Sequence, residues 1–388
     1  MESTKTTIKP ERLELNPAKR TQLLKEGADP HKHHRHQHGD ETHHHHHTSA
    51  PVPGPEARLP IASTKTHPTD TSKHPSSNDP NPHESSVYFI GNATTVIEWQ
   101  GIRILTDPNF LHAGDHVHLG PGVTAERLKN PAVDIDALPP LDCILLSHYH
   151  EDHFDRLVED SLNRYFPIVS TPHAKKALCD RKEDPFRAVY DLDFFESLIM
   201  PVLSEQGKQR KAAVKVTGMP GKHVPPGPLS VANDLLGAVP PTNGWMIELG
   251  FHTPVTGEDD IETGYRIYIS GDTLMVDELK EIPSRMLRDG QKIDLMLVHL
   301  GGTTIPGPHM PLLMVTMDGK QGVQLMRLMD PDVTIPVHFD DYSVMLSGLD
   351  DFKKEIEAAG FQDRVVYLDR GDQYRFRVLG GDEEDGSA

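Results

Sequence analysis

Four potential metal ligands within six residues constrain this chain more than any other feature of its sequence. The apolar segment 143–146 runs directly into His148, His150, Asp152 and His153. Where a strand ends in a tight loop, alternate side chains point the same way, so His148 and His150 can bind one metal ion. Asp152 and His153 come from the following turn and can face a second ion. Imidazole and carboxylate ligands without thiolate suit Zn²⁺, with Mn²⁺ or iron as alternatives.

A closed site needs further ligands, and we expect them at the ends of other strands. Three residues meet this condition, because each lies just after or at the end of a β-branched, apolar run: His223, Asp272 and His338. We therefore treat them as candidate ligands for the same pair of ions.

Two more histidines, His299 and His309, fall in the sequence between Asp272 and His338. A loop in this region could lie over the metal ions, so substrate contact and a structural role are equal alternatives for both residues. Three further histidines, at positions 112, 116 and 118, follow Pro108 and can reach the rim of the same pocket.

From residue 85 onward the sequence predicts mainly strands at first and then strands that alternate with helices. The dipeptide Gln100-Gly101 predicts a hairpin turn. This order favours an α/β (α+β) fold with sheets layered against helices, in one domain over residues 85–380. Runs of β-branched and aromatic residues predict strands at 87–90, 94–99, 102–108, 143–146, 167–170, 213–217, 245–249, 265–270, 294–299, 333–338, 365–369 and 373–379. Helical patterns are fewer, at 172–180, 276–281, 318–329 and 350–359.

Residues 1–84 have a different composition and are predicted to be a disordered leader. They hold 13 of the 25 His and 11 of the 33 Pro, with too few large apolar residues to offset the entropy of ordering. The tracts 31–38 and 43–47 could chelate Zn, Ni or Cu weakly, although low-complexity sequence is the stronger explanation for them. Residues 381–388 are predicted to be a flexible acidic tail.

Charge and cysteine content narrow the function classes. The leader is electrically balanced, so the net charge of −19 belongs to the remainder of the chain. An acidic surface repels phosphate backbones, so we expect a small-molecule substrate and no nucleic acid. Two Cys cannot build a disulfide framework. Because neither a signal peptide nor a long apolar segment is present, we expect a cytoplasmic protein; oligomeric state and peripheral membrane contact stay open.

These residues resemble the metallo-β-lactamase-fold hydrolases over about residues 85–380. The segment from His148 to His153 matches the His-x-His-x-Asp-His signature of that family. The segments GNATTVIEWQGIRILTDPNF (91–110), LPPLDCILLSHYHEDHFD (138–155) and SGDT (270–273) resemble the branch that contains L-ascorbate-6-phosphate lactonase and N-acylphosphatidylethanolamine phospholipase D. The resemblance implies a four-layer αββα sandwich.

The resemblance also implies a role for each candidate ligand. Asp107 matches a buried aspartate that supports the metal loop from behind. Asp152 also becomes the group that orients a metal-bound water or accepts its proton. The implied ligand sets are His148, His150 and His223 for one ion, Asp152, His153 and His338 for the other, and Asp272 as the bridge between them.

Two bound divalent ions, most simply Zn²⁺, predict a hydrolase that uses a metal-activated water on a lactone, ester or phosphodiester. An iron-dependent oxidoreductase of the same fold is the first alternative. A non-enzymatic metal buffer that acts through the histidine-rich leader is the second.

Overall fold

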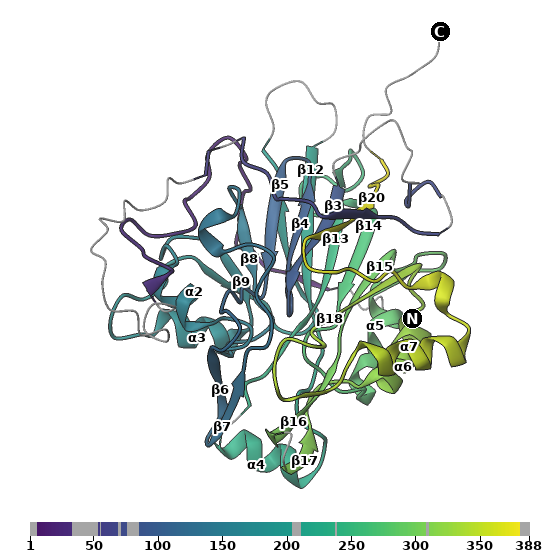
Figure 1. The fold of residues 1–388 in the computed structure, drawn as a ribbon. Coiled ribbons are helices and arrows are strands. Elements are labelled where there is room, and N and C mark those ends of the chain that lie inside the picture. The colour runs from purple at the N-terminus through teal and green to yellow at the C-terminus, as the bar shows by residue number, and fades with distance from the viewer. Residues whose placement is uncertain are drawn as a thin grey trace.

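The computed structural model describes residues 6–32, 53–54, 56–68, 71–75, 85–203, 211–236, 239–307 and 310–380. Two large β-sheets face each other, and helices lie on their outer faces (Figure 1). One sheet has seven strands in the order β1 (Thr7–Ile8), β11 (Glu196–Pro201), β12 (Lys211–Met219), β13 (Gly244–His252), β14 (Glu262–Ile269), β15 (Leu295–His299) and β18 (Val333–Val337). The other has eight, in the order β10 (Val189–Asp191), β9 (Ile168–Ser170), β8 (Cys143–Leu145), β5 (Ile102–Thr106), β4 (Thr94–Trp99), β3 (Ser85–Gly91), β20 (Asp372–Phe376) and β2 (Ser63–Lys65).

Two small sheets and the helices complete the architecture. A hairpin of β6 (His116–Gly120) and β7 (Val123–Glu126) forms one small sheet, and the other places β16 (Gly301–Gly307) between β17 (Met310–Met314) and β19 (Met345–Ser347). The α-helices of the described residues are α2 (Arg156–Ser161), α3 (Pro172–Cys179), α4 (Pro228–Leu236), α5 (Glu281–Met286), α6 (Gly319–Met329) and α7 (Leu349–Ala359). Figure 1 shows α2 and α3 beside one large sheet and α5, α6 and α7 beside the other, with α4 and both small sheets at one end.

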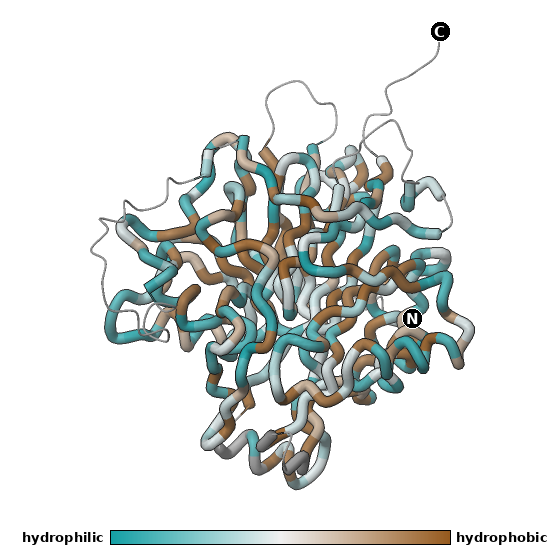
Figure 2. The backbone as a smooth tube through the Cα atoms, in the orientation of Figure 1, coloured by the Kyte–Doolittle hydropathy of each residue, from teal (hydrophilic) through white to brown (hydrophobic). Residues whose placement is uncertain are grey.

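Strand periodicity explains why there are four layers. In β3, Val87 and Phe89 belong to the apolar cluster between the two sheets, whereas Tyr88 and Ile90 belong to the cluster under α2 and α3. A third cluster joins the outer face of the seven-stranded sheet to α5, α6 and α7. Figure 2 shows the apolar segments gathered in this interior. Three apolar interfaces between four layers make the αββα sandwich that the family resemblance implied.

Most of the predicted elements are present, and the differences have local causes. The hairpin between β4 and β5 turns at Gln100 and Gly101, whose φ angles of 51° and 77° fit the twist of a two-residue hairpin. The predicted strand 365–369 is wrong: Val366 N donates to Thr334 O, and only one isolated bridge, between Thr334 and Val365, joins it to the sheet. Its apolar side chains pack into the core without a ladder. The predicted helix 276–281 is a 3₁₀ turn at Asp277–Lys280, and α5 starts where the prediction ended. The elements β6, β7, β10, β11, β16, β17, β19, α2 and α4 are short or weakly patterned and were not predicted.

The described parts of the leader depart from the prediction of disorder. Leu13 and Leu15 are buried between the two sheets, and β1 pairs in parallel with β11. Further along, β2 pairs in parallel with β20, and His74 is buried with its Nδ1 2.8 Å from the hydroxyl of Tyr374. A few apolar residues are enough to order these leader segments, because the edges of the two sheets also supply backbone hydrogen bonds. Most of the histidine-rich sequence and the acidic tail lie outside the described residues, namely 33–38, 43–47 and 381–388.

Within the described part of the chain, no helix combines the length and apolar character needed to cross a bilayer.

Candidate metal centre

The loop that follows β8 carries the signature residues, and α2 fixes where it ends. Asp155 caps this helix, because its carboxylate accepts a hydrogen bond from Val158 N at 2.8 Å. The same carboxylate accepts from Phe110 N at 2.5 Å, which ties the loop to the segment after β5. A short strand, a capped helix and a neighbouring loop thus hold both ends of the signature.

The structure brings all seven predicted ligands together. Asp272 follows β14, His223 follows β12 and His338 follows β18, so the three elements deliver them to one end of the sandwich. Within each group, one ligand atom from every residue lies within 4.8 Å of the others. The first group is His148, His150 and His223, and the second is Asp152, His153, Asp272 and His338.

Asp272 lies between the two groups. Its Oδ2 is 2.9 Å from Nε2 of His153 and 3.5 Å from Nε2 of His338, both in the second group. The same oxygen is 3.6 Å from Nε2 of His223, which belongs to the first group. This position suits a carboxylate that bridges two ions.

Hydrogen bonds at Nδ1 orient the imidazoles. Nδ1 of His223 donates to the carbonyl oxygen of Val315 at 2.5 Å, and Nδ1 of His338 donates to that of Leu300 at 3.1 Å. Nδ1 of His153 donates to Asp107 Oδ2 at 2.9 Å. With Nδ1 protonated, the lone pair is on Nε2, the nitrogen that faces the cluster.

Two ring nitrogens test whether the cluster fits metal ions. Nε2 of His148 and Nε2 of His150 are both buried and have no hydrogen-bond partner. A buried polar atom without a partner costs about 1–3 kcal/mol, and a metal ion would supply the missing partner to both. The donor set of imidazoles and carboxylates therefore fits divalent ions.

Asp107 supports the signature loop from behind. Its carboxylate accepts hydrogen bonds from Ser147 N at 2.7 Å and from the Ser147 hydroxyl at 2.8 Å, besides the one from His153. The Ser147 hydroxyl in turn lies 2.9 Å from Nδ1 of His148. One carboxylate thus orients a ligand from each of the two groups. Asp107 also has a φ of 35°, a strained conformation for a residue with a side chain.

The structure describes only one of the two candidate substrate-contact residues, His299 and His309. His299 is the last residue of β15 and is buried, with Nδ1 donating to Asp272 Oδ1 at 2.9 Å. It therefore contacts the carboxylate of Asp272 and is not among the described residues that line the pocket. His309 lies outside the described residues. Of the two equal alternatives for His299, the structure favours support of a ligand.

Several supporting residues carried no recognisable signal in the sequence. Asn92 and Asn109 both donate through Nδ2 to the carbonyl oxygen of Asp152, at 2.6 and 2.9 Å. Asp341 accepts from Asn92 N at 2.9 Å and forms a fully buried ion pair of 3.0 Å with Arg127. Asp341 is thus built into the site and is not a solvated surface charge. Only its position next to the predicted strand end hinted at this role.

The electrostatics of the ligand cluster favour a bound positive charge. Burial alone would raise the pKa of the Asp152 carboxyl, but the imidazoles of His153 and His150 hold that pKa well below its usual range. Burial lowers the pKa of His153, but the carboxylates of Asp272 and Asp152 outweigh it and raise that pKa well above its usual value. Burial holds the pKa of His148 well below its usual value. Ionised carboxylates and a neutral imidazole are the forms that bind cations.

The pocket over the cluster is small and has apolar walls. Its cavity is about 10 Å³, room for about one water molecule. Among the described residues that line it, none is Lys or Arg. The walls come from the β6–β7 hairpin, the segment after α4 and the β16–β17 hairpin, through Leu119, Val239, Thr303, Ile305 and Val315.

Comparison with known proteins places the chain in a family. The family described as "Beta-lactamase superfamily domain" matches residues 86–338. A UPF0173 metal-dependent hydrolase from Archaeoglobus fulgidus is 22% identical over 290 residues, which cover 75% of this chain and 98% of the relative. A second such hydrolase, from Salinibacter ruber, is 24% identical over 277 residues, 71% of this chain and 94% of the relative.

The solved structures agree on the fold. The crystal structure of an isothiocyanate hydrolase from Delia radicum gut bacteria superimposes with a TM-score of 0.56 at 17% identity, covering 75% of this chain and 99% of that one. The chain therefore belongs to the beta-lactamase superfamily, and its fold is the metallo-β-lactamase fold.

Proposed function

We propose that this protein is a binuclear metal-dependent hydrolase that acts on a neutral ester or lactone with a small apolar group. The observation that carries the proposal is the seven-residue cluster, in which Asp272 lies between two sets of ligands. The hydrolase names of the relatives from Archaeoglobus fulgidus and Salinibacter ruber support the same reaction class.

Each set of ligands would hold one ion. His148, His150 and His223 would bind the first, and Asp152, His153 and His338 the second, with Asp272 shared. Two divalent ions, most simply Zn²⁺, would polarise the carbonyl oxygen of the substrate and lower the pKa of a bound water to near neutrality.

The protein groups contribute orientation and proton transfer. Asp152 is the carboxylate that would orient the attacking water and accept its proton at Oδ1, a buried atom that lies 3.0 Å from Nδ1 of His150. Asn92 and Asn109 fix the backbone of that residue through its carbonyl oxygen, so its carboxylate is held in place. No serine, cysteine or lysine nucleophile is needed for this chemistry.

The pocket wall favours an ester or lactone over a phosphodiester. A phosphodiester carries a negative charge, and proteins commonly hold phosphate oxygens with arginine or lysine. The described lining lacks both and offers Leu119, Val239, Ile305 and Val315 instead. A neutral carbonyl compound with an apolar substituent matches such a wall.

Metal content and turnover of the full chain test the proposal. Protein purified without chelators should contain about two ions per chain, and should hydrolyse p-nitrophenyl butyrate or a short-chain lactone faster than bis-p-nitrophenyl phosphate. Asp152→Asn and His150→Ala should lose turnover while the circular dichroism spectrum stays that of the parent. The matched control His173→Ala, at an exposed position at the start of α3, should keep full activity.

Each contrary result has a distinct meaning. Less than one ion per chain, or full activity in Asp152→Asn, would overturn the binuclear mechanism. A preference for the phosphodiester would overturn the substrate class alone. Bound iron with oxygen consumption would replace the hydrolase by the oxidoreductase alternative.

A further inference from the structure

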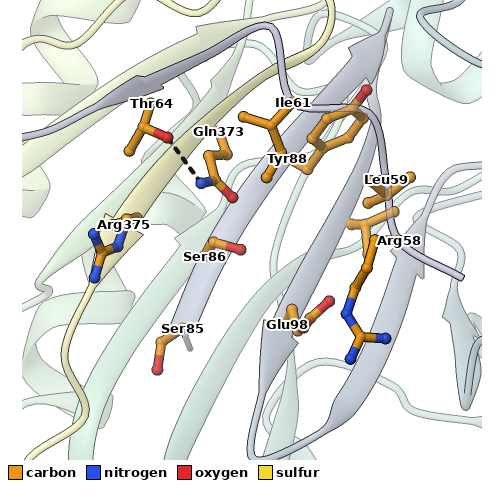
Figure 3. A pocket seen from close by; sticks show the side chains of 11 residues that line it. Arg58, Leu59, Ile61, Thr64, Ser85, Ser86, Tyr88, Glu98, Gln373 and Arg375 are labelled. Carbon is orange, nitrogen blue, oxygen red and sulfur yellow. Dashed lines mark hydrogen bonds between the residues drawn. The ribbon is translucent and has the colours of Figure 1, made fainter. Parts of the chain in front are cut away.

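A second cavity lies on the outer face of the eight-stranded sheet. It has a volume of about 280 Å³ and shares no lining residue with the pocket over the metal cluster. Segment 58–64 of the leader forms one wall, and β3, β4 and β20 form the floor (Figure 3). We call it the leader cleft.

Strand register explains why this floor is hollow. Ser86 of β3 is the cross-strand neighbour of Glu98 on β4 and of Arg375 on β20. A serine between two longer side chains leaves room above it, because cross-strand neighbours stand side by side on one face of a sheet. In the next row, Tyr88 lies between Val96 and Gln373. The cavity is therefore a product of residue size at one position of the sheet.

The charges of the leader cleft favour an anion. Nη2 of Arg375 is buried and has no hydrogen-bond partner. The acidic residue on the floor, Glu98, is already paired, since its Oε2 accepts from Arg103 Nε at 2.6 Å. Figure 3 shows Arg58 and Arg375 on opposite sides of the cleft, with Ser86 between them. A buried guanidinium nitrogen without a partner is costly, and an anionic group would satisfy it.

One side of the leader cleft is apolar and is held in position. Leu59 and Ile61 of the leader lie near Tyr88 of the sheet (Figure 3), and Val96 also lines the cleft. The hydroxyl of Tyr88 donates to the carbonyl oxygen of Pro60 at 2.8 Å, which fastens the leader over the floor. The cavity thus offers a cationic end and an apolar body.

We propose that the leader cleft binds a small organic anion, whose carboxylate or phosphate pairs with Arg375 and whose apolar part lies between Tyr88 and Ile61. This site is separate from the metal cluster and does not depend on the proposed reaction.

Calorimetric titration of the full-length, metal-loaded protein tests the proposal with four probes. Octanoate and octyl phosphate present the two head groups, octanol lacks the charge and inorganic phosphate lacks the apolar part. At least one of the two amphipathic anions should bind more tightly than octanol and inorganic phosphate, and the one that binds identifies the head group. Equal affinity for octanol, or for inorganic phosphate, would overturn the proposal, as would no binding of either anion.

Variants decide whether binding occurs in the leader cleft. Arg375→Gln should weaken the binding of the anion about tenfold or more, because a charge-assisted hydrogen bond is lost. Ser86→Leu keeps every charge and fills the hollow, so it should abolish binding even if Arg375→Gln disturbs the fold. Arg288→Gln, the same change at an exposed position after α5, should leave affinity unchanged. Hydrolysis by Ser86→Leu should equal that of the parent. Unchanged affinity in Ser86→Leu would place the anion elsewhere and overturn the proposal.

Discussion

Single residues around the metal cluster differ in how far sequence could predict them. The signature ligands are easy to predict, because four potential metal ligands follow an apolar run within six residues: His148, His150, Asp152 and His153. The position of His299 could not be predicted, since the direction of its side chain depends on where β15 ends and on the register of its neighbours. Its ring lies nearly parallel to those of His153 and His338, at interplanar angles of 12° and 19°. Sequence thus reveals ligands more readily than the groups behind them.

The variant His299→Leu should weaken metal binding without removing a ligand. Loss of the hydrogen bond to Asp272 Oδ1 would free the carboxylate of Asp272 to rotate, and such losses typically reduce metal affinity about 10–100-fold. Competition with a chromogenic chelator measures the affinity, and excess metal should restore turnover. His173→Leu is the matched control, at an exposed site. Parent-like affinity in His299→Leu would show that Asp272 needs no support from this residue.

At the scale of elements, strands with β-branched runs were predictable and the docking of the leader was not. The leader contributes only two short strand pairings, β1 with β11 and β2 with β20, and composition alone does not predict them. The leader is held in place because a few of its apolar side chains pack on the core formed by the rest of the chain. The site followed the same rule, because the ligands at strand ends were predictable but the hairpins that wall the pocket were not.

Shortening Leu15 should destabilise the whole domain, although it lies in the leader. Leu15 is 1% exposed in the core between the sheets, so Leu15→Ala should lower the free energy of unfolding by about 2–4 kcal/mol. Urea denaturation measures the loss. Ile8→Ala, in β1 at 40% exposure, is the control and should cost much less. Equal stability of Leu15→Ala and the parent would mean that residues 6–32 do not dock in solution.

At the scale of the whole molecule, one carboxylate joins three distant parts of the chain. Asp332 lies just before β18, 2.9 Å from Lys292 Nζ and 3.7 Å from Nε2 of the leader residue His74. Burial alone would raise the pKa of Asp332, but the nearby His74 ring and the hydrogen bond from Lys292 lower it to about 2, from an ordinary 3.8. Such long-range pairings follow from the folded topology, and no local pattern in the sequence encodes them.

The lowered pKa predicts a loss of stability in acid. A carboxyl whose folded pKa is depressed contributes its full stabilisation above the unfolded value of about 3.8, and this is lost as the pH falls toward 2. Asp332 is about one third exposed, so we expect a contribution of about 1 kcal/mol after solvent screening. Asp332→Asn should therefore be less stable than the parent at pH 6, and the difference should shrink by pH 2.5. Asp289→Asn, at an exposed position, is the control. A difference that does not change with pH would contradict this assignment.

The two leader strands also have a consequence for the behaviour of this protein at high concentration. β1 and β2 each form the outermost strand on one side of their sheet, so they cover the backbone edges of β11 and β20. An uncovered edge strand is a template for pairing with another chain. A chain shortened past residue 65 would present both edges at once, and light scattering should then detect aggregation under conditions in which the full chain stays monodisperse.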